Sequence, residues 1–156
     1  MECVSIANGY LRIIGMAVKR DATDKALSDS VRASENYTCE RCGKYYPEGH
    51  GRKGLHCSHY RGRSGKSTRW HPDNLDCLCY GCHMYFSGER FEYDAWKRKK
   101  LGDDRYDRLV LRANKPKKTP KWEQLLIRKH YQSEFKRIQD ERKNGKQGHI
   151  RIIPYD

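Results

Sequence analysis

The chain is poor in the residues that build a large apolar core. Only 36% of its 156 residues are hydrophobic, and phenylalanine occurs three times. A small core of this kind needs support from a metal or a partner subunit. Long apolar runs are also lacking, because the run YLRIIGMAV at 10–18 is broken by Arg12 and is too short to span a bilayer. That run has neither the basic region nor the cleavage site of a secretory signal, so we expect a soluble, cytoplasmic protein without membrane contact.

Acidic residues are in deficit. The chain has 33 Lys and Arg against 20 Asp and Glu, which gives a net charge of +13. Such an excess favours a polyanionic partner, and nucleic acid is the commonest one. Binding to a membrane surface would call for a basic helix with a large apolar face, which the sequence does not offer. DNA is therefore the expected partner.

The pattern along the chain predicts an α+β protein in four segments. They are an N-terminal arm or strand at 1–21, a core with flanking helices at 22–114, a basic linker with a C-terminal helix at 115–143, and a tail at 144–156. We expect the tail to be loosely ordered or to pack on a partner. Helices are predicted over 23–34 with Thr23 as N-cap, from about 79 to 100 with Gly88 as a candidate interruption, over 103–114, and from Thr119 as N-cap to about 143 with Pro120 first.

Cysteine spacing gives the strongest local signal. Four cysteines form two Cys-x-x-Cys pairs, a spacing that suits a tetrahedral structural zinc site: Cys39 with Cys42, and Cys79 with Cys82. An intracellular setting disfavours disulfides, and the alternative of four unligated thiols fits the paired spacing poorly. A site with four protein ligands has no open position, so this zinc is expected to pin a hairpin and to do no chemistry. We expect ordinary thiols at Cys3, Cys57 and Cys77.

The stretch LHCSHYRGRSGKSTRWHPDN at 55–74 lies between the two cysteine pairs and has the pattern of a strand, a basic turn and a returning strand. His59 ends the first strand, Asn74 opens the second, and His83 directly follows the last zinc ligand. Zinc coordination would bring these three side chains together. Their order on a strand–turn–strand–helix resembles the HNH, or ββα-metal, nuclease motif.

The resemblance implies a small zinc-stapled ββα-metal core and a role for each residue. His59 would be the general base that activates water, and His83 would bind a catalytic Mg²⁺ or Mn²⁺ ion. Asn74 would orient the hairpin and His59, or reach the catalytic ion itself. The chain departs from the common pattern at Ser58, where the family often has a metal ligand. His56 could replace that ligand if the strand twists enough, and a weaker candidate is Asp73.

Basic residues surround this hairpin, with no acid between positions 52 and 69. They could form only a solvated surface, but beside a phosphodiester site they are better explained as contacts to the DNA backbone. We expect phosphate contacts from Arg61, Arg63, Lys66 and Arg69.

A closer resemblance covers residues from about 22 to 138. The stretches TDKALSDSVRASENYTCERCG, LHCSHYRGR, TRWHPDNLDCLCYGCH and WEQLLIRKHYQSEFKRI, with the SG of YFSGERFEY, are similar to the phage NinG/Rap family of recombination nucleases. The four-cysteine zinc is also similar to that of endonuclease VII-type junction resolvases. What this implies is a metal-dependent, structure-specific endonuclease that cuts Holliday junctions or D-loops during phage recombination in the host cytoplasm. A four-way junction needs two opposed cuts, so a homodimer is expected.

Two other functions stay open on the sequence alone. The first is a general HNH nicking or restriction-type endonuclease that acts on ordinary duplex DNA. The second is a non-catalytic zinc-ribbon DNA-binding protein in which the histidines are remnants. An RNA-binding zinc protein fits the charge but lacks the clustered aromatic residues of a base-stacking platform.

Overall fold

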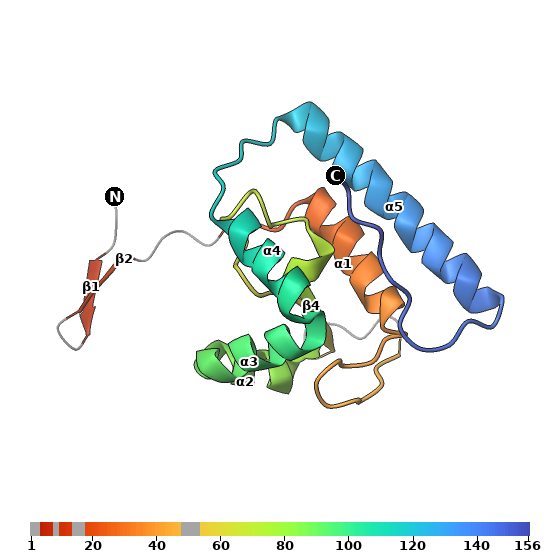
Figure 1. Cartoon of the computed structure of the whole chain (residues 1–156), viewed down its shortest axis with the longest axis horizontal. Coiled ribbons are helices and arrows are strands. Elements are labelled where there is room, and N and C mark those ends of the chain that lie inside the picture. The colour runs from red at the N-terminus through yellow and green to blue at the C-terminus, as the bar shows by residue number, and fades with distance from the viewer. Residues whose placement is uncertain (1–3, 8–9, 14–17, 48–53) are drawn as a thin grey trace.

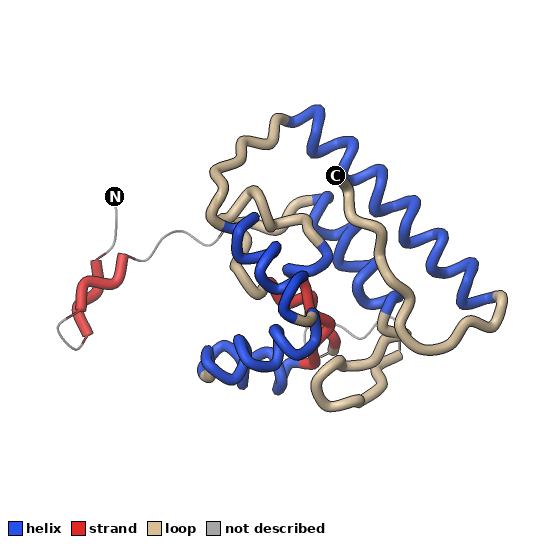
Figure 2. The backbone as a smooth tube through the Cα atoms, in the orientation of Figure 1, coloured by secondary structure: helices blue, strands red, loops and turns tan. Residues whose placement is uncertain are grey.

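The computed structural model describes residues 4–7, 10–13, 18–47 and 54–156. Within these ranges the protein has an α+β architecture in which helices surround a two-stranded hairpin (Figures 1 and 2). The elements are β1 (Val4–Ala7), β2 (Tyr10–Ile13), α1 (Ala22–Ser34), β3 (Leu55–His59), the 3-10 turn η1 (Pro72–Asn74), β4 (Leu75–Cys79), α2 (Tyr80–Gly88), α3 (Arg90–Leu101), α4 (Asp103–Ala113) and α5 (Lys121–Lys143). None of the helices in the described ranges is long and apolar enough to cross a bilayer.

The β3–β4 hairpin lies at the centre of the core. The strands are antiparallel, with Leu55 opposite Cys79 and His59 opposite Leu75. All five residues of β4 are buried, as expected of a strand covered on both faces. Helix α1 packs on one face of the hairpin, and α2 and α3 cover the other. The end of β4 leads directly into α2, so the second cysteine pair straddles the strand–helix junction.

Two helix starts differ from the prediction. The N-cap of α1 is Asp21 rather than Thr23, and its carboxylate accepts from the backbone N–H groups of Thr23 and Asp24 at 2.9 Å each. Thr23 already lies inside the first turn. At α5 the N-cap is Pro120, whose extended backbone places it outside the helix, so Thr119 is one residue too early to cap. The expected interruption at Gly88 is confirmed, since α2 ends there and α3 begins at Arg90.

The tail after α5 packs on the chain itself, so the expectation of a loose or partner-bound tail was wrong. It runs back along α1 and α5 (Figure 1). Ile150 and Ile152 are buried, and the Ile150 N–H donates to the carbonyl of Ser34 at 3.0 Å. The alternating isoleucines of HIRIIP supply the apolar contacts that hold the tail in place.

A buried ionic cluster fixes α3 against the hairpin. Asp76 of β4 accepts from Lys97 at 2.7 Å, from Lys100 at 2.6 Å and from the Tyr93 hydroxyl at 2.6 Å. Asp76 and Lys97 are both fully buried. Burial alone would raise the pKa of Asp76, but the charges of Lys97 and Lys100 outweigh it and lower the pKa to about 2. This cluster makes α3 a firm support beneath the hairpin.

Candidate functional site

The four paired cysteines converge as predicted. The sulfur atoms of Cys39, Cys42, Cys79 and Cys82 all lie within 4.8 Å of one another, and those of Cys42 and Cys79 are 3.9 Å apart. A tetrahedral zinc with bonds of about 2.3 Å has edges of roughly 3.8 Å, so the donor set fits a structural zinc. The described cysteines are all free thiols. In the described ranges these four are also the one group of three or more residues suited to hold a metal.

The chain around the first cysteine pair is shaped for ligation. Gly43 has φ +70°, a left-handed conformation that glycine adopts without strain, and its N–H donates to the carbonyl of Cys39 at 2.9 Å. Glu40 joins this turn to β4, because its N–H donates to the Cys77 carbonyl and its carboxylate accepts from the Cys77 N–H at 2.6 Å. Arg41 reaches to 3.6 Å from the Cys82 sulfur. That cation offsets the negative charge which four thiolates would bring.

His83, on the first turn of α2, meets His56 of β3. Their Nδ1 atoms are 3.0 Å apart, and the rings cross edge to face at 80°. This is the distance of a hydrogen bond between the two rings. It is also close to the separation of roughly 3 Å between two imidazole nitrogens that ligate one ion through bonds of about 2.0–2.1 Å. His56 was the uncertain substitute in the sequence, and it is the residue that the fold brings to His83.

Ser58 faces the core instead of a metal. Its hydroxyl lies 3.2 Å from that of Tyr93, and the residue is buried. Side chains alternate along a strand, so Ser58 and His56 share the face that looks toward α2 and α3. The position where the resembled family often has a ligand is therefore a packing position here, and His56, one strand repeat earlier, is the residue that contacts His83.

His59 ends β3 on the other face of the strand, toward α1. Burial, together with the charge of Arg63, lowers its pKa from 6.5 to about 4, and the charge of Asp24 opposes both. The ring also has a hydrogen bond to the backbone of Arg69, which fixes its orientation. The expected meeting of His59 with His83 is therefore not seen: among the described residues the ring of His83 contacts His56 and not His59. The charge of Arg63 nevertheless acts on both His59 and His83, so this arginine lies within electrostatic reach of each ring.

Asn74 ties the two ends of the basic turn together. Its side-chain oxygen accepts from the Arg61 N–H at 2.8 Å, and its backbone carbonyl accepts from the Tyr60 N–H at 2.8 Å. The residue is fully buried, and its amide nitrogen Nδ2 has no hydrogen-bond partner among the described residues. Of the two roles that the sequence left open, this geometry favours orientation of the hairpin over metal ligation, because the oxygen that would bind a metal is engaged.

The four arginine and lysine residues expected at phosphates divide into two groups. Arg61 and Lys66 are exposed and Arg63 is half-buried, which leaves their charges available to a ligand. Arg69 is different, and the expectation for it was wrong. It is 3% exposed, and its guanidinium donates to Asp24 at 2.6 Å and 3.0 Å and to Asp21 at 3.1 Å. Arg69 joins the hairpin turn to the start of α1.

Sequence reasoning missed the partners that hold these side chains. The most informative are Asp24, which also accepts from the Trp70 indole at 3.0 Å, and the buried cluster around Asp76. A single acid inside the apolar strand LDCLC was the available signal, since a buried carboxylate needs cations from elsewhere in the fold. The identity of those cations, on α3, could not be inferred from spacing.

Comparison of the chain with protein-family models, curated proteins and solved structures gave no match. The function of the chain is therefore inferred from its own sequence and from the geometry of this site.

Proposed function

We propose that this protein is a metal-dependent DNA endonuclease of the HNH, or ββα-metal, type, and that its substrate is branched DNA. The observation that carries the proposal is the arrangement around the cysteine cluster. A hairpin and the helix after it meet at four clustered thiols, with His56 and His83 in contact and His59 at the strand end. Arg63 lies within charge range of His59 and His83, as a phosphate-binding group should.

His59 is the proposed general base. Its low pKa keeps the imidazole neutral at physiological pH, and a phosphate bound beside the ring would raise that pKa toward the range in which a general base is efficient. The hydrogen bond to the Arg69 backbone holds the ring in one orientation. Asn74 supports it indirectly, because it closes the turn that carries Arg61 and Arg63.

His56 and His83 are the proposed ligands of a catalytic divalent ion. Such an ion would supply stabilisation of negative charge on the phosphate and on the leaving oxygen. Imidazole nitrogens suit Mn²⁺ and the later transition ions better than Mg²⁺, which prefers oxygen ligands. We therefore expect Mn²⁺ to support a higher rate than Mg²⁺.

The preference for branched DNA, the homodimer and the place in phage recombination rest on the resemblance to the NinG/Rap family. The net charge of +13 supports a polyanionic substrate but does not choose among DNA forms. A general duplex nuclease and a non-catalytic binding protein are the alternatives that an experiment must separate.

Cleavage of an end-labelled four-way junction and of a linear duplex with the same sequence tests the proposal. We expect cuts placed symmetrically in the junction with Mn²⁺, fewer with Mg²⁺, none without added divalent ion, and little cutting of the duplex. Equal cutting of both substrates would contradict the preference for branched DNA and would support a general duplex nuclease. Binding without cleavage under either ion would contradict the nuclease and leave a zinc-containing DNA-binding protein.

A further inference from the structure

A second basic surface lies along α4. Arg105, Arg108 and Arg112 are spaced by three and four residues, which places them on one face of the helix over about 10 Å. They line a groove of about 660 Å³ between α4, the linker after it and the C-terminal tail. We call it the α4 groove, and its cations are Arg105, Arg108, Arg112, Lys115, Lys117 and Arg151.

The charges in the α4 groove are not balanced. Its six cations face two aspartates, Asp73 and Asp156, which pair with Arg105 and Arg112. Lys117 pairs with Glu123 at 2.9 Å. The other cations have no ion-pair partner in the described part of the chain; they are Arg108, Lys115 and Arg151.

The acids of α4 do not neutralise these cations. Asp103 and Asp107 both turn toward α3 and pair with Arg98, and Asp104 is not among the residues that line the groove. The helix therefore presents its arginines to the groove and directs two of its carboxylates elsewhere. A concave surface with this excess of positive charge attracts an anion.

A carboxylate already occupies one anion position in the groove. Asp156 Oδ1 accepts from both terminal nitrogens of Arg112, at 3.1 Å and 3.0 Å. A guanidinium binds a phosphate oxygen in the same way. The contact shows that the groove can hold an oxyanion, and it makes Asp156 a competitor for any phosphate that binds there.

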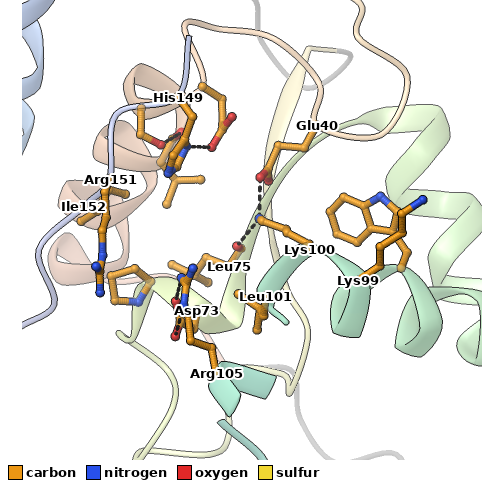
Figure 3. Close-up of a pocket in the computed structure, with 15 residues that line it drawn as sticks. Glu40, Asp73, Leu75, Lys99, Lys100, Leu101, Arg105, His149, Arg151 and Ile152 are labelled. Carbon is orange, nitrogen blue, oxygen red and sulfur yellow. Dashed lines mark hydrogen bonds and ion pairs between the residues drawn. The ribbon is translucent and has the colours of Figure 1, made fainter. Parts of the chain in front are cut away.

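The α4 groove adjoins the basic turn of the hairpin. Arg112 Nε donates to the Ser67 carbonyl at 2.9 Å, and a small cavity is lined by Lys66 together with Arg112 and Lys117. Figure 3 shows the adjoining pocket, where Arg151 and Arg105 lie near Asp73 and Lys99 and Lys100 lie beyond Leu101. Lys66 therefore lies between the hairpin turn and the α4 groove.

The turn η1 contacts both surfaces. Asn74 faces the hairpin and holds Arg61, whereas the residues before it, Pro72 and Asp73, line the α4 groove. Consecutive residues of this short turn thus contact the hairpin and line the groove.

We propose that the α4 groove binds the phosphate backbone of a second DNA segment while the hairpin holds the segment that is cut. The inference rests on the proposed function and deepens it, since it assigns the recognition of branched DNA to named residues. A linear duplex offers the protein one segment at a time, and a four-way junction offers two. The groove would then contribute to junction binding and little to duplex binding.

Binding of the full-length protein to a four-way junction and to a linear duplex, without added divalent ion, tests this independently of cleavage. Arg108→Ala with Arg151→Ala removes two unpaired groove cations, and Lys129→Ala with Lys136→Ala removes two exposed cations of α5 as the matched control. We expect the groove variant to bind the junction roughly tenfold more weakly and to lower the salt slope by about 2. The control variant should lose much less affinity for the junction.

A second variant acts in the opposite direction. Asp156→Asn removes the competing carboxylate and should strengthen junction binding several-fold, whereas Asp140→Asn on α5 makes the same charge change outside the groove and serves as its control. A gain from Asp156→Asn cannot come from misfolding.

The outcomes separate the two proposals. Equal losses for junction and duplex, or no loss beyond that of the control, would overturn the second-segment site. Selective loss of junction binding would support it even if the wild-type protein cut no DNA, in which case only the proposed nuclease activity would fail.

Discussion

Removal of the zinc is expected to unfold the core of this protein. The four cysteines join the turn after α1 to the junction of β4 and α2, and only 36% of the chain is hydrophobic. Apparent binding free energies of structural zinc, about 10–16 kcal/mol, are as large as the whole stability of a typical domain, roughly 5–15 kcal/mol. Loss of the metal should therefore remove most of the folding free energy.

Metal analysis and spectroscopy check this prediction. Purified protein should contain about one zinc per chain. Chelation should expose the buried Trp70 to water and shift the tryptophan fluorescence to longer wavelength, and added zinc should reverse the shift. Cys42→Ser should have nearly the same effect as chelation although Cys42 is exposed. Cys57→Ala, at a thiol outside the cluster, is the matched control and should fold with zinc bound. A chelated protein that keeps its full structure would contradict a structural role for the metal.

Substitution of His59 is expected to remove cleavage and spare DNA binding. Loss of a general base lowers rates by about 10²–10⁴-fold, and His59→Ala should fall in this range. The affinity for DNA should change little, because the phosphate contacts are assigned to Arg61, Arg63 and Lys66. The control is His130→Ala on α5, whose ring contacts the carbonyl of Ile153 at 2.9 Å. If His59→Ala cut at the wild-type rate, the assignment of the base would be wrong.

The pH profile provides a second test of His59. Burial and the charge of Arg63 lower its pKa to about 4. The proposed base is the neutral form of the ring. Activity that depends on neutral His59 is therefore present above about pH 4 and is lost as the pH falls below that value. We expect kcat/KM, which reports the free enzyme, to show no acid limb near 6.5 between pH 5.5 and 7.5.

Binding of DNA and substitution of Arg63 should each shift the pH of the acid limb in a direction that follows from charge. A phosphate beside His59 favours the imidazolium, so the acid limb of the rate at saturating DNA should lie above that of kcat/KM. Arg63→Ala removes a positive charge and should also raise the limb, while Arg63→Lys should leave it in place. At a saturating concentration of divalent ion, which keeps the proposed ligands His56 and His83 deprotonated, a wild-type limb near pH 6.5 in kcat/KM would show that His59 is not the buried, neutral base.

The sequence by itself determined the parts that depend on local pattern. The paired Cys-x-x-Cys spacing predicted a cluster that the structure places within 4.8 Å, and periodicity with Gly88 as a break predicted the helices after β4. The strand–turn–strand course from Leu55 to Cys79 was predictable from the apolar ends and the basic, glycine-containing middle. These features are encoded by neighbours in the chain, so they are visible without the fold.

Tertiary structure decided which residues of similar chemistry serve the site and which serve the core. Arg69 and Arg63 look alike in sequence, but the carboxylates at the start of α1 take Arg69 into a buried ion pair and leave Arg63 near the histidines. On the same face of β3, His56 contacts His83 of α2, whereas Ser58 contacts Tyr93 of α3. The α4 groove needs α4, the linker and the tail together. Each outcome depends on contacts between segments far apart in the chain, and spacing carries no information about such contacts.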